Sequence, residues 1–263
     1  MFNLPIFKSS FKRSYTLKDT LGKGGYGTVS ICTRRSDNKT FSAKIIRKDK
    51  KKTLPCGTPS EVFYLSKCHH PNIIPFLGFY KTRNTWVILT EYSPHYMDLH
   101  QFIAIKGPLS SLLTLSIFQQ LISALQHCFT IGIDHRDVKD ENVLINTRTL
   151  KIKLIDFGAA APHDLIPYNN GSCTGRYLPP EFWRSGFCET YCSTVWALGC
   201  LMFKMCTGKA PFDHAVECAR NVVDAVSLSM VDESLRSLVT LMLEPNPRKR
   251  LQWKALCGIM STN

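Results

Sequence analysis

The spacing of hydrophobic residues changes near residue 91 of the chain. Before that point they occur in short runs rich in β-branched and aromatic residues, separated by turn signals such as Ser36-Asp37-Asn38. Runs of this kind are typical of strands, and consecutive strands joined by short turns pair in antiparallel fashion. The pattern predicts strands at 15–21, 28–33, 40–46, 73–81 and 85–91.

One helix is expected among these strands, and helices dominate the rest of the chain. Thr58-Pro59-Ser60-Glu61 predicts a helix start, because proline fits the first turn, and the helix should run to about residue 68. Further on, Leu113, Ile117, Leu121 and Leu125 recur at four-residue spacing. We expect Ser111 to cap this helix and Gly132 to stop it. Three more helices are predicted at 194–206, 234–243 and 251–260.

These elements predict an α+β protein with two lobes, one rich in strands and one mostly helical. The division falls at 91–94, and ligand sites commonly lie between two such units. Hydrophobic residues make up 44% of the chain and charged residues 20%, which is sufficient for a substantial core. No apolar run reaches the roughly 18 residues of a membrane helix, so we do not expect membrane association.

The net charge of +13 raises the question of a nucleic-acid partner. The basic residues are scattered, however, and the only dense run, at 48–52, has no interleaved aromatic residue, so we interpret it as a solvated loop. The basic residues of 1–14 indicate a short arm ahead of the fold. Eleven cysteines without a Cys-x-x-Cys pair favour reduced thiols over a zinc site, which predicts a cytoplasmic or nuclear protein.

A glycine-rich segment separates the first two predicted strands. Residues 22–29 read Gly-Lys-Gly-Gly-Tyr-Gly-Thr-Val, and a strand follows where a dinucleotide-binding turn would lead into a helix. A glycine hairpin lets backbone N–H groups approach phosphates closely. By itself the motif is weak, and an ordinary turn explains it equally well.

Two charged residues fit a phosphate site beside this hairpin. Lys44 lies in the third strand, seventeen residues after Gly27, and its ammonium could reach back to bound phosphates. Glu61, near the start of the predicted helix, could pair with Lys44 and hold it in place. Taken alone, either residue could equally be a solvent-facing surface charge.

The strongest chemical signal is His-Arg-Asp-Val-Lys-Asp-Glu-Asn at 135–142, a polar run between apolar flanks. Burying such a cluster as ordinary core would be costly. The carboxylate of Asp137 can accept or orient the proton of an attacking hydroxyl. Lys139 can neutralise a transferring phosphoryl group, and the amide of Asn142 can ligate magnesium.

Two acidic motifs follow this run. Asp156-Phe157-Gly158 comes nineteen residues after Asp137, and Asp156 supplies a second magnesium ligand. Further along, Glu181 follows two prolines, and Arg250 lies near the C-terminal end of the chain. We expect these two to form a buried bidentate pair, although they could be unrelated surface charges.

Together the motifs resemble those of the protein kinase family over residues 15–260. The closest resemblance is to the Pim group of serine/threonine kinases, and it rests on 135–142, 154–158 and 177–181. It implies a bilobal kinase fold with a basic arm at 1–14, an N-lobe at 15–91 and a C-lobe at 92–263. The N-lobe is expected to hold an antiparallel sheet and one main helix. It also implies that ATP and Mg²⁺ bind between the lobes.

The resemblance carries over to individual residues. It makes Lys44, Glu61, Asp137 and Lys139 the catalytic residues, and Asn142 and Asp156 the metal ligands. Thr90 looks like the gatekeeper at the rear of the adenine pocket. Residues expected at the nucleotide are Leu21, Gly22, Lys23, Gly24, Gly25, Tyr26, Gly27, Thr28, Val29, Ser42, Lys44, Thr90, Glu91, Ser93, Asp98 and Leu144. Residues expected to face the protein substrate are Asp98, Asp140, Glu141 and Thr174.

Several positions depart from the family pattern. Asp134 replaces an apolar residue before His135, and Thr194 replaces an aspartate that braces the catalytic loop in most kinases. Ser93 stands where Pim kinases have a hinge proline. No acid occurs from 165 to 180, so Arg136 lacks a carboxylate there, and Ser172 or Thr174 could supply a phosphate instead. Lys209, Ala215 and Val216 stand where Pim kinases would have further acids.

The leading hypothesis is a monomeric, ATP-dependent kinase that phosphorylates serine or threonine hydroxyls of protein substrates. Asp134 and Thr194 favour an alternative, a pseudokinase scaffold without turnover. A third hypothesis, a nucleic-acid-binding module, rests on charge alone, because no recognition helix, stacking platform or zinc spacing supports it.

Overall fold

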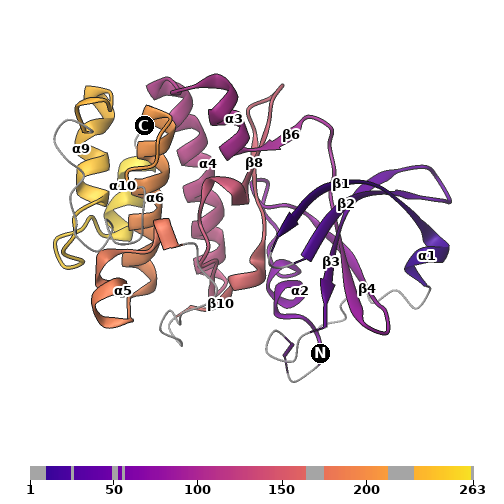
Figure 1. Cartoon of the computed structure of the whole chain (residues 1–263). Coiled ribbons are helices and arrows are strands. Elements are labelled where there is room, and N and C mark those ends of the chain that lie inside the picture. Colours follow the sequence, from indigo (N-terminus) through magenta and orange to yellow (C-terminus); the bar gives the residue numbers. More distant parts are fainter. Residues whose placement is uncertain are drawn as a thin grey trace.

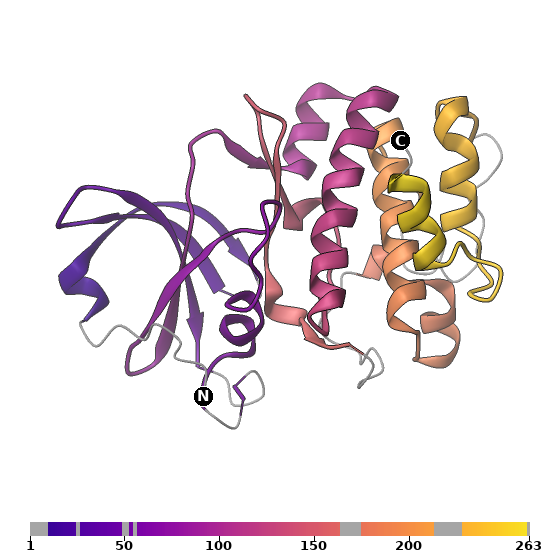
Figure 2. The same ribbon diagram turned by 180° about the vertical axis from the view of Figure 1, so that it is seen from behind.

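The chain folds into two lobes that lie side by side (Figures 1 and 2). This computed structural model describes residues 10–24, 27–48, 53–54, 57–163, 175–212 and 228–261. The smaller lobe contains the first part of the chain, and the larger lobe contains most of the helices. The predicted α+β architecture with a strand-rich and a helical lobe is therefore confirmed.

A five-stranded antiparallel sheet forms the N-lobe, in the order β1-β2-β3-β5-β4. All five predicted strands are present, with boundaries that differ by a few residues. The strands are β1 (Tyr15–Gly24), β2 (Gly27–Arg34), β3 (Thr40–Arg47), β4 (Phe76–Lys81) and β5 (Thr85–Thr90). At the start of β2, Gly27 has a φ of 139°, and a side chain there would collide with the Ile45 carbonyl of β3. Only glycine fits this position.

The two faces of the sheet follow from strand alternation. Ala43, Val87 and Leu89 are buried on one face with the aromatic rings of Phe11 and Tyr15. On the other face, Trp86 and Ile88 join a second cluster. The latter face therefore points toward helix α2, and the polar members of β3 on that face lie at the junction of the lobes.

Residues before 15 contribute to the fold, contrary to the expectation of an arm lying ahead of it. Phe11, in the short helix α1 (Phe11–Ser14), is buried and stacks on Tyr15 with ring centroids 5.2 Å apart. Phe11 therefore covers the face of the sheet that carries Ala43, Val87 and Leu89. Sequence reasoning missed this because the few aromatic residues of a short basic segment carry no periodic signal.

Helix α2 (Ser60–Leu65) is shorter than predicted. Its N-cap is Pro59 rather than a hydroxyl residue, and Ser66 closes it in place of the expected end near residue 68. Val62 and Leu65 are buried, and the helix lies beside the turn that follows Asp156. Helix α2 therefore contacts both lobes.

The C-lobe is built around two buried helices. They are α4 (Ser111–Thr130) and α6 (Thr190–Thr207), and nearly every residue of α6 is buried, as its all-round apolar pattern predicts. Gly199 of α6 lets helix α9 approach, because a Cβ there would lie 2.9 Å from the side chains of Leu243 and Met242. Among the described residues, the other helices of this lobe are α3 (Leu99–Lys106), α5 (Pro180–Ser185), α9 (Glu233–Met242) and α10 (Trp253–Ser261).

Helix α4 differs from the prediction in two respects. Its cap is Ser110, whose hydroxyl accepts a 3.3 Å hydrogen bond from the Leu113 amide, rather than Ser111. It is also long and apolar enough to cross a bilayer, although no segment was expected to be. Half of its residues are buried inside the C-lobe, as in the core helix of a globular domain.

Short strands and turns line the side of the C-lobe that faces the sheet. They are β6 (Tyr96–Asp98), β7 (Ile133–Asp134), β8 (Val143–Asn146), β9 (Ile152–Leu154) and β10 (Ala161–Pro162). Three single 3₁₀ turns accompany them: η2 (Asp140–Asn142), η3 (Phe157–Ala159) and η4 (Gly175–Tyr177). These elements carry most of the polar residues that the sequence singled out.

A buried ion pair anchors α5 in this lobe. Arg250 donates to both oxygens of Glu181, over 2.7 and 2.8 Å, and its guanidinium lies 4.9 Å from the ring centroid of Trp196. The predicted bidentate pair is confirmed. It joins two segments that lie 69 residues apart in the sequence.

Candidate active site

Three charged side chains from different elements meet between the lobes. The ammonium of Lys44 on β3 lies 2.7 Å from Oε1 of Glu61 on α2 and 2.8 Å from Oδ1 of Asp156. Burial by itself would lower the pKa of Lys44, but the charges of Glu61 and Asp156 outweigh burial and raise it. Lys44 is therefore a fixed cation inside the cleft, as the sequence predicted for a phosphate ligand.

The catalytic-loop candidates cluster around Asp137. The side-chain amide of Asn142 donates to the Asp137 backbone oxygen at 2.7 Å and to its Oδ2 at 2.8 Å. The ammonium of Lys139 lies 3.0 Å from the same Oδ2. Asp137 and Asn142 are buried, while Lys139 is partly exposed. The structure thus places the side chains of Lys139 and Asn142 within hydrogen-bonding distance of one carboxylate, that of Asp137.

His135 connects this loop to the segment that carries Asp156. Its Nε2 lies 2.9 Å from the carbonyl oxygen of Ile155, and its Nδ1 accepts a 3.3 Å hydrogen bond from the Asp137 amide. Burial lowers the pKa of His135, so the neutral ring with a proton on Nε2 satisfies both contacts. The ring also lies edge-on against Phe157, with centroids 4.7 Å apart. His135 therefore fixes the positions of Asp137 and Asp156 relative to each other.

Asp134 has an ionic partner within the loop itself. It is fully buried, and its carboxylate accepts from the backbone amide of Arg136 at 3.2 Å and from the Arg136 Nε at 3.3 Å. Burial raises the pKa of Asp134, while the charge of Arg136 and a hydrogen bond from Thr190 act in the opposite direction. Sequence reasoning had left Arg136 without a carboxylate in 165–180. The structure supplies one from two residues upstream.

The contact with Thr190 also bears on the missing brace at position 194. Thr194 is buried in α6. Thr190, one turn earlier on the same helix, lies close enough to the carboxylate of Asp134 to act against the rise of its pKa. The acid on the catalytic loop is thus near a hydroxyl at the start of α6.

The residues expected around the adenine ring lie on the cleft-facing side of the sheet. Val29 is the direct cross-strand partner of Lys44, and Ser42 is the partner of Thr90. Directly paired residues in neighbouring strands project from the same face. Leu144 lies on β8 of the opposite lobe, and all of these side chains except the exposed Leu21 are partly buried.

Between the lobes, the hinge forms a tight turn at Ser93. The Ser93 carbonyl accepts from the Tyr96 amide at 3.1 Å, and its hydroxyl accepts from the His95 amide at 3.3 Å. Glu91 is held by Tyr96, whose hydroxyl donates to Oε1 over 3.3 Å. Ser93 therefore stabilises the turn through its side chain, which a proline at this position could not do.

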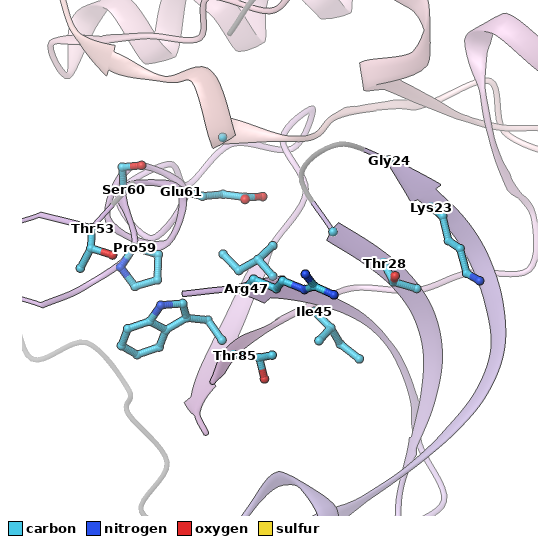
Figure 3. Close-up of a pocket in the computed structure, with 14 residues that line it drawn as sticks. Lys23, Gly24, Thr28, Ile45, Arg47, Thr53, Pro59, Ser60, Glu61 and Thr85 are labelled. Carbon is cyan, nitrogen blue, oxygen red and sulfur yellow. The ribbon is translucent and has the colours of Figure 1, made fainter. Parts of the chain in front are cut away.

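A cavity of about 590 Å³ lies beside the glycine-rich hairpin (Figure 3). Gly24 and Thr28 line one side, and Glu61 projects into it from α2 on the other. The adenine-wall residues do not line this cavity. Lys44 and Asp156 do not line it either, so the cavity lies next to Glu61, between the glycine-rich hairpin and the start of α2, and is not the predicted phosphate site itself.

Asn142 and Asp156 together fit a magnesium ion by their donor chemistry. Asn142 uses its amide nitrogen on Asp137, so its Oδ1 faces the opposite way. In the described part of the chain, the hydrogen bonds to Asp156 from Lys44 and Gly158 both fall on Oδ1, at 2.8 and 3.1 Å, which leaves Oδ2 for a ligand. Amide and carboxylate oxygens are the hard ligands that Mg²⁺ prefers.

Two residues expected to face a protein substrate have other partners. Asp140 is only 1% exposed and binds Tyr177, His100 and Lys204, so the expectation that it faces a substrate is wrong. Both oxygens of Asp98 are engaged by Gln101, at 2.7 Å each, in capping α3. A short polar residue before a helix is the usual signal for a cap. The capping role of Asp98 was missed because helix α3 itself was not predicted. Glu141, in contrast, is exposed as expected.

Three predicted site residues lie outside the described part of the chain. They are Gly25 and Tyr26 of the glycine-rich hairpin and Thr174. The same holds for Ser172, Ala215 and Val216.

This arrangement agrees with the family and the individual proteins that the chain resembles in sequence. Residues 15–259 match the protein kinase domain. The pim-2 serine/threonine-protein kinase of Danio rerio is 32% identical over 258 residues, which cover 92% of this chain and 83% of that protein. The prk-2 serine/threonine-protein kinase of Caenorhabditis elegans is 29% identical, over 94% of this chain and 58% of its own length.

A kinase with a different name is similar to nearly the same degree. Human NUAK family SNF1-like kinase 1 is 31% identical over 92% of this chain, which spans only 37% of that protein. The chain belongs to the protein kinase family, and the names of its relatives group it with the serine/threonine protein kinases. Members of this family generally use ATP with Mg²⁺.

Proposed function

We propose that this chain is an active, Pim-like kinase that transfers the γ-phosphate of ATP to serine or threonine hydroxyls of proteins. The observation that carries the proposal is the convergence on one cleft of Lys44, Glu61 and Asp156, with distances of 2.7 and 2.8 Å at the lysine. Both lobes contribute to it, so the groups that hold phosphate and metal are already assembled.

The roles follow from the geometry. Lys44, fixed by Glu61, binds phosphate oxygens of ATP beneath the glycine-rich hairpin. Asn142 and Asp156 hold Mg²⁺, which neutralises phosphate charge when it is bound. Asp137 orients the acceptor hydroxyl and accepts its proton, and Lys139 stabilises the charge on the phosphoryl group in transit. Positioning and electrostatics of this kind supply most of the catalysis in phosphoryl transfer.

The pseudokinase alternative rested on Asp134 and Thr194. In the structure Asp134 is paired with Arg136, so the buried acid of the loop has an ionic partner although position 194 holds no acid. This pairing supports an intact catalytic loop. The Pim-like part of the proposal is supported by the similarity to pim-2 and prk-2 and by the motif at 135–142.

A transfer assay with radiolabelled ATP, Mg²⁺ and a mixture of serine peptides tests the proposal. We expect Asp137→Asn to lower the rate by about 10²–10⁴-fold, because it removes the carboxylate that takes the proton. The affinity for ATP, measured by calorimetry, should stay within a few-fold of the parent value. If parent and variant transfer phosphate equally, or if neither does, the chain is not the proposed enzyme.

A further inference from the structure

A second charged cluster lies on the C-lobe side of the catalytic loop. Asp140, the third residue after Asp137, accepts from the Tyr177 hydroxyl at 2.8 Å, and its Oδ2 lies 2.9 Å from Nδ1 of His100. The ammonium of Lys204 forms an ion pair with the same Oδ2 and lies 2.9 Å from the His100 Nδ1. We refer to His100, Asp140, Tyr177 and Lys204 as the Asp140 cluster.

The Asp140 cluster has the form of a cation site. Ligand atoms of His100, Asp140 and the neighbouring Glu141 all lie within 4.8 Å of one another, a spacing that can hold a positive ion. The cation in this position is the chain's own Lys204. Its side chain is 12% exposed, and it reaches the site from the last turn of the buried helix α6. The acidic group is therefore neutralised from within.

The Asp140 cluster also lies where an acceptor protein must bind. Asp140 begins the turn η2, and Asn142 at the end of that turn bonds directly to Asp137. The nucleotide site occupies the N-lobe side of Asp137. A protein that brings a hydroxyl to Asp137 therefore has to lie over the C-lobe surface around η2.

Exposed charges near the cluster include the acidic Glu141, next to Asp140, and two basic residues. Lys209, just beyond the end of α6, and Arg176 of η4 are exposed. Asp98 caps α3, and Glu91 is held by Tyr96. With 33 basic and 20 acidic residues, the chain as a whole is strongly positive. An arginine-rich acceptor would meet repulsion here and find few carboxylates to bind.

We propose that Lys204 is a specificity-determining residue: it fills the cation site beside the catalytic loop, so that the enzyme prefers acceptor proteins with acidic rather than basic residues near the hydroxyl. The inference deepens the proposed function and rests on transfer to a protein hydroxyl. Removing the ammonium leaves the carboxylate of Asp140 open to a guanidinium from the substrate.

Three peptides that differ only in the residues flanking one serine, with arginine, alanine or glutamate, provide the test. The affinity of each peptide is measured by fluorescence anisotropy, which needs no turnover, and kcat/KM is measured by phosphate transfer. For the parent chain we expect both affinity and kcat/KM to be highest for the glutamate peptide, lower for the alanine peptide and lowest for the arginine peptide. Lys204→Met keeps the apolar stem, and it should shift the ratio of glutamate to arginine toward arginine by about tenfold, the effect of one ion pair.

Two further variants separate charge from general damage. Lys204→Arg retains the positive charge and should keep the parent's order of peptides. Lys106→Ala removes an exposed lysine at the far end of α3, outside the Asp140 cluster, and should leave the ratio unchanged. Thermal melting of all variants shows whether each one is folded.

The outcomes distinguish this inference from the proposed function. If the parent prefers the arginine peptide, or if Lys204→Met leaves the ratio unchanged while melting normally, the inference is overturned even though transfer occurs. If anisotropy shows the expected order and its shift in Lys204→Met while no peptide is phosphorylated, the peptide site stands and the proposed activity fails. If Lys204→Met does not fold, the order of the three peptides measured with the parent and with Lys204→Arg decides whether the inference holds.

Discussion

The two sides of Asp137 use charged residues in different ways. On the nucleotide side, Lys44, Glu61 and Asp156 come from both lobes and converge on a space that a ligand can enter. On the acceptor side, His100, Asp140 and Lys204 belong to the C-lobe alone and neutralise one another. The number of charges near a cleft therefore says little about what it binds, because internal partners decide which charges a ligand meets.

The largest expected effect is on the nucleotide side. Lys44→Met removes the cation that contacts both carboxylates, so kcat/KM for phosphate transfer should fall by about 10²–10³-fold, as for loss of one preorganised electrostatic group. Lys18→Met, an exposed position on β1, is the control and should match the parent. A Lys44→Met protein with parental kinetics would show that this cluster is only structural.

The next largest effect is expected at Asp134, at the start of the catalytic loop that separates the two sides. Asp134→Ala removes the carboxylate bonded to Arg136, and breaking a buried pair of this kind costs about 3 kcal/mol of unfolding free energy. Urea unfolding measures the loss. Asp134→Asn keeps a hydrogen-bond acceptor, and it should lose less.

The same pair makes a prediction about phosphorylation. Because Arg136 already has a carboxylate partner in Asp134, treating the parent protein with phosphatase should leave its rate of transfer unchanged. A large drop in rate would instead show that a phosphate group on the chain supplies charge that Asp134 does not.

On the acceptor side, Asp140→Asn should affect stability more than nucleotide binding. Burial disfavours the charged form of Asp140, but its contacts with the Lys204 ammonium and the Tyr177 hydroxyl outweigh it and lower the pKa from 3.8 to about 2. A carboxyl whose pKa is lowered on folding stabilises the folded state above its unfolded pKa. The loss in Asp140→Asn should be about 2 kcal/mol at pH 7.

The pH dependence provides the check. The contribution of Asp140 should disappear as the pH falls from about 4 to about 2, because the unfolded chain takes up the proton first. Urea unfolding of parent and variant with EDTA, across that range, should show the two curves converging. If their difference stays constant with pH, the ionised form of Asp140 does not contribute to stability.

The smallest effect is expected at Asp98, which borders both sides. Its carboxylate caps α3 by accepting from the amide and side chain of Gln101, so Asp98→Ala should cost about 1 kcal/mol in urea unfolding. The affinity for ATP should change by less than about threefold, since the carboxylate is already engaged. A tenfold loss of affinity would instead favour the ribose contact expected from the sequence.

Residues whose roles depend on short-range chemistry were predictable from the sequence. The strands of the N-lobe follow from β-rich runs and turn signals, and Gly27 fills a backbone position that only glycine fits. The run at 135–142 stood out because burying so many polar groups between apolar flanks is costly unless they have a function. Asp156 stood out by its spacing from Asp137. The Glu181–Arg250 pair was predicted correctly from charge and position near two prolines.

What the sequence could not give are the partners of Asp140 and Arg136. Asp140 read as a substrate-facing acid, and Arg136 as a cation in need of a phosphate. Only the folded chain brings Lys204 of α6 to Asp140, across 64 residues, and turns Asp134 back onto Arg136. Sequence patterns report what each residue can do within a few neighbours, whereas ion pairing falls steeply with distance and is decided when distant segments pack together.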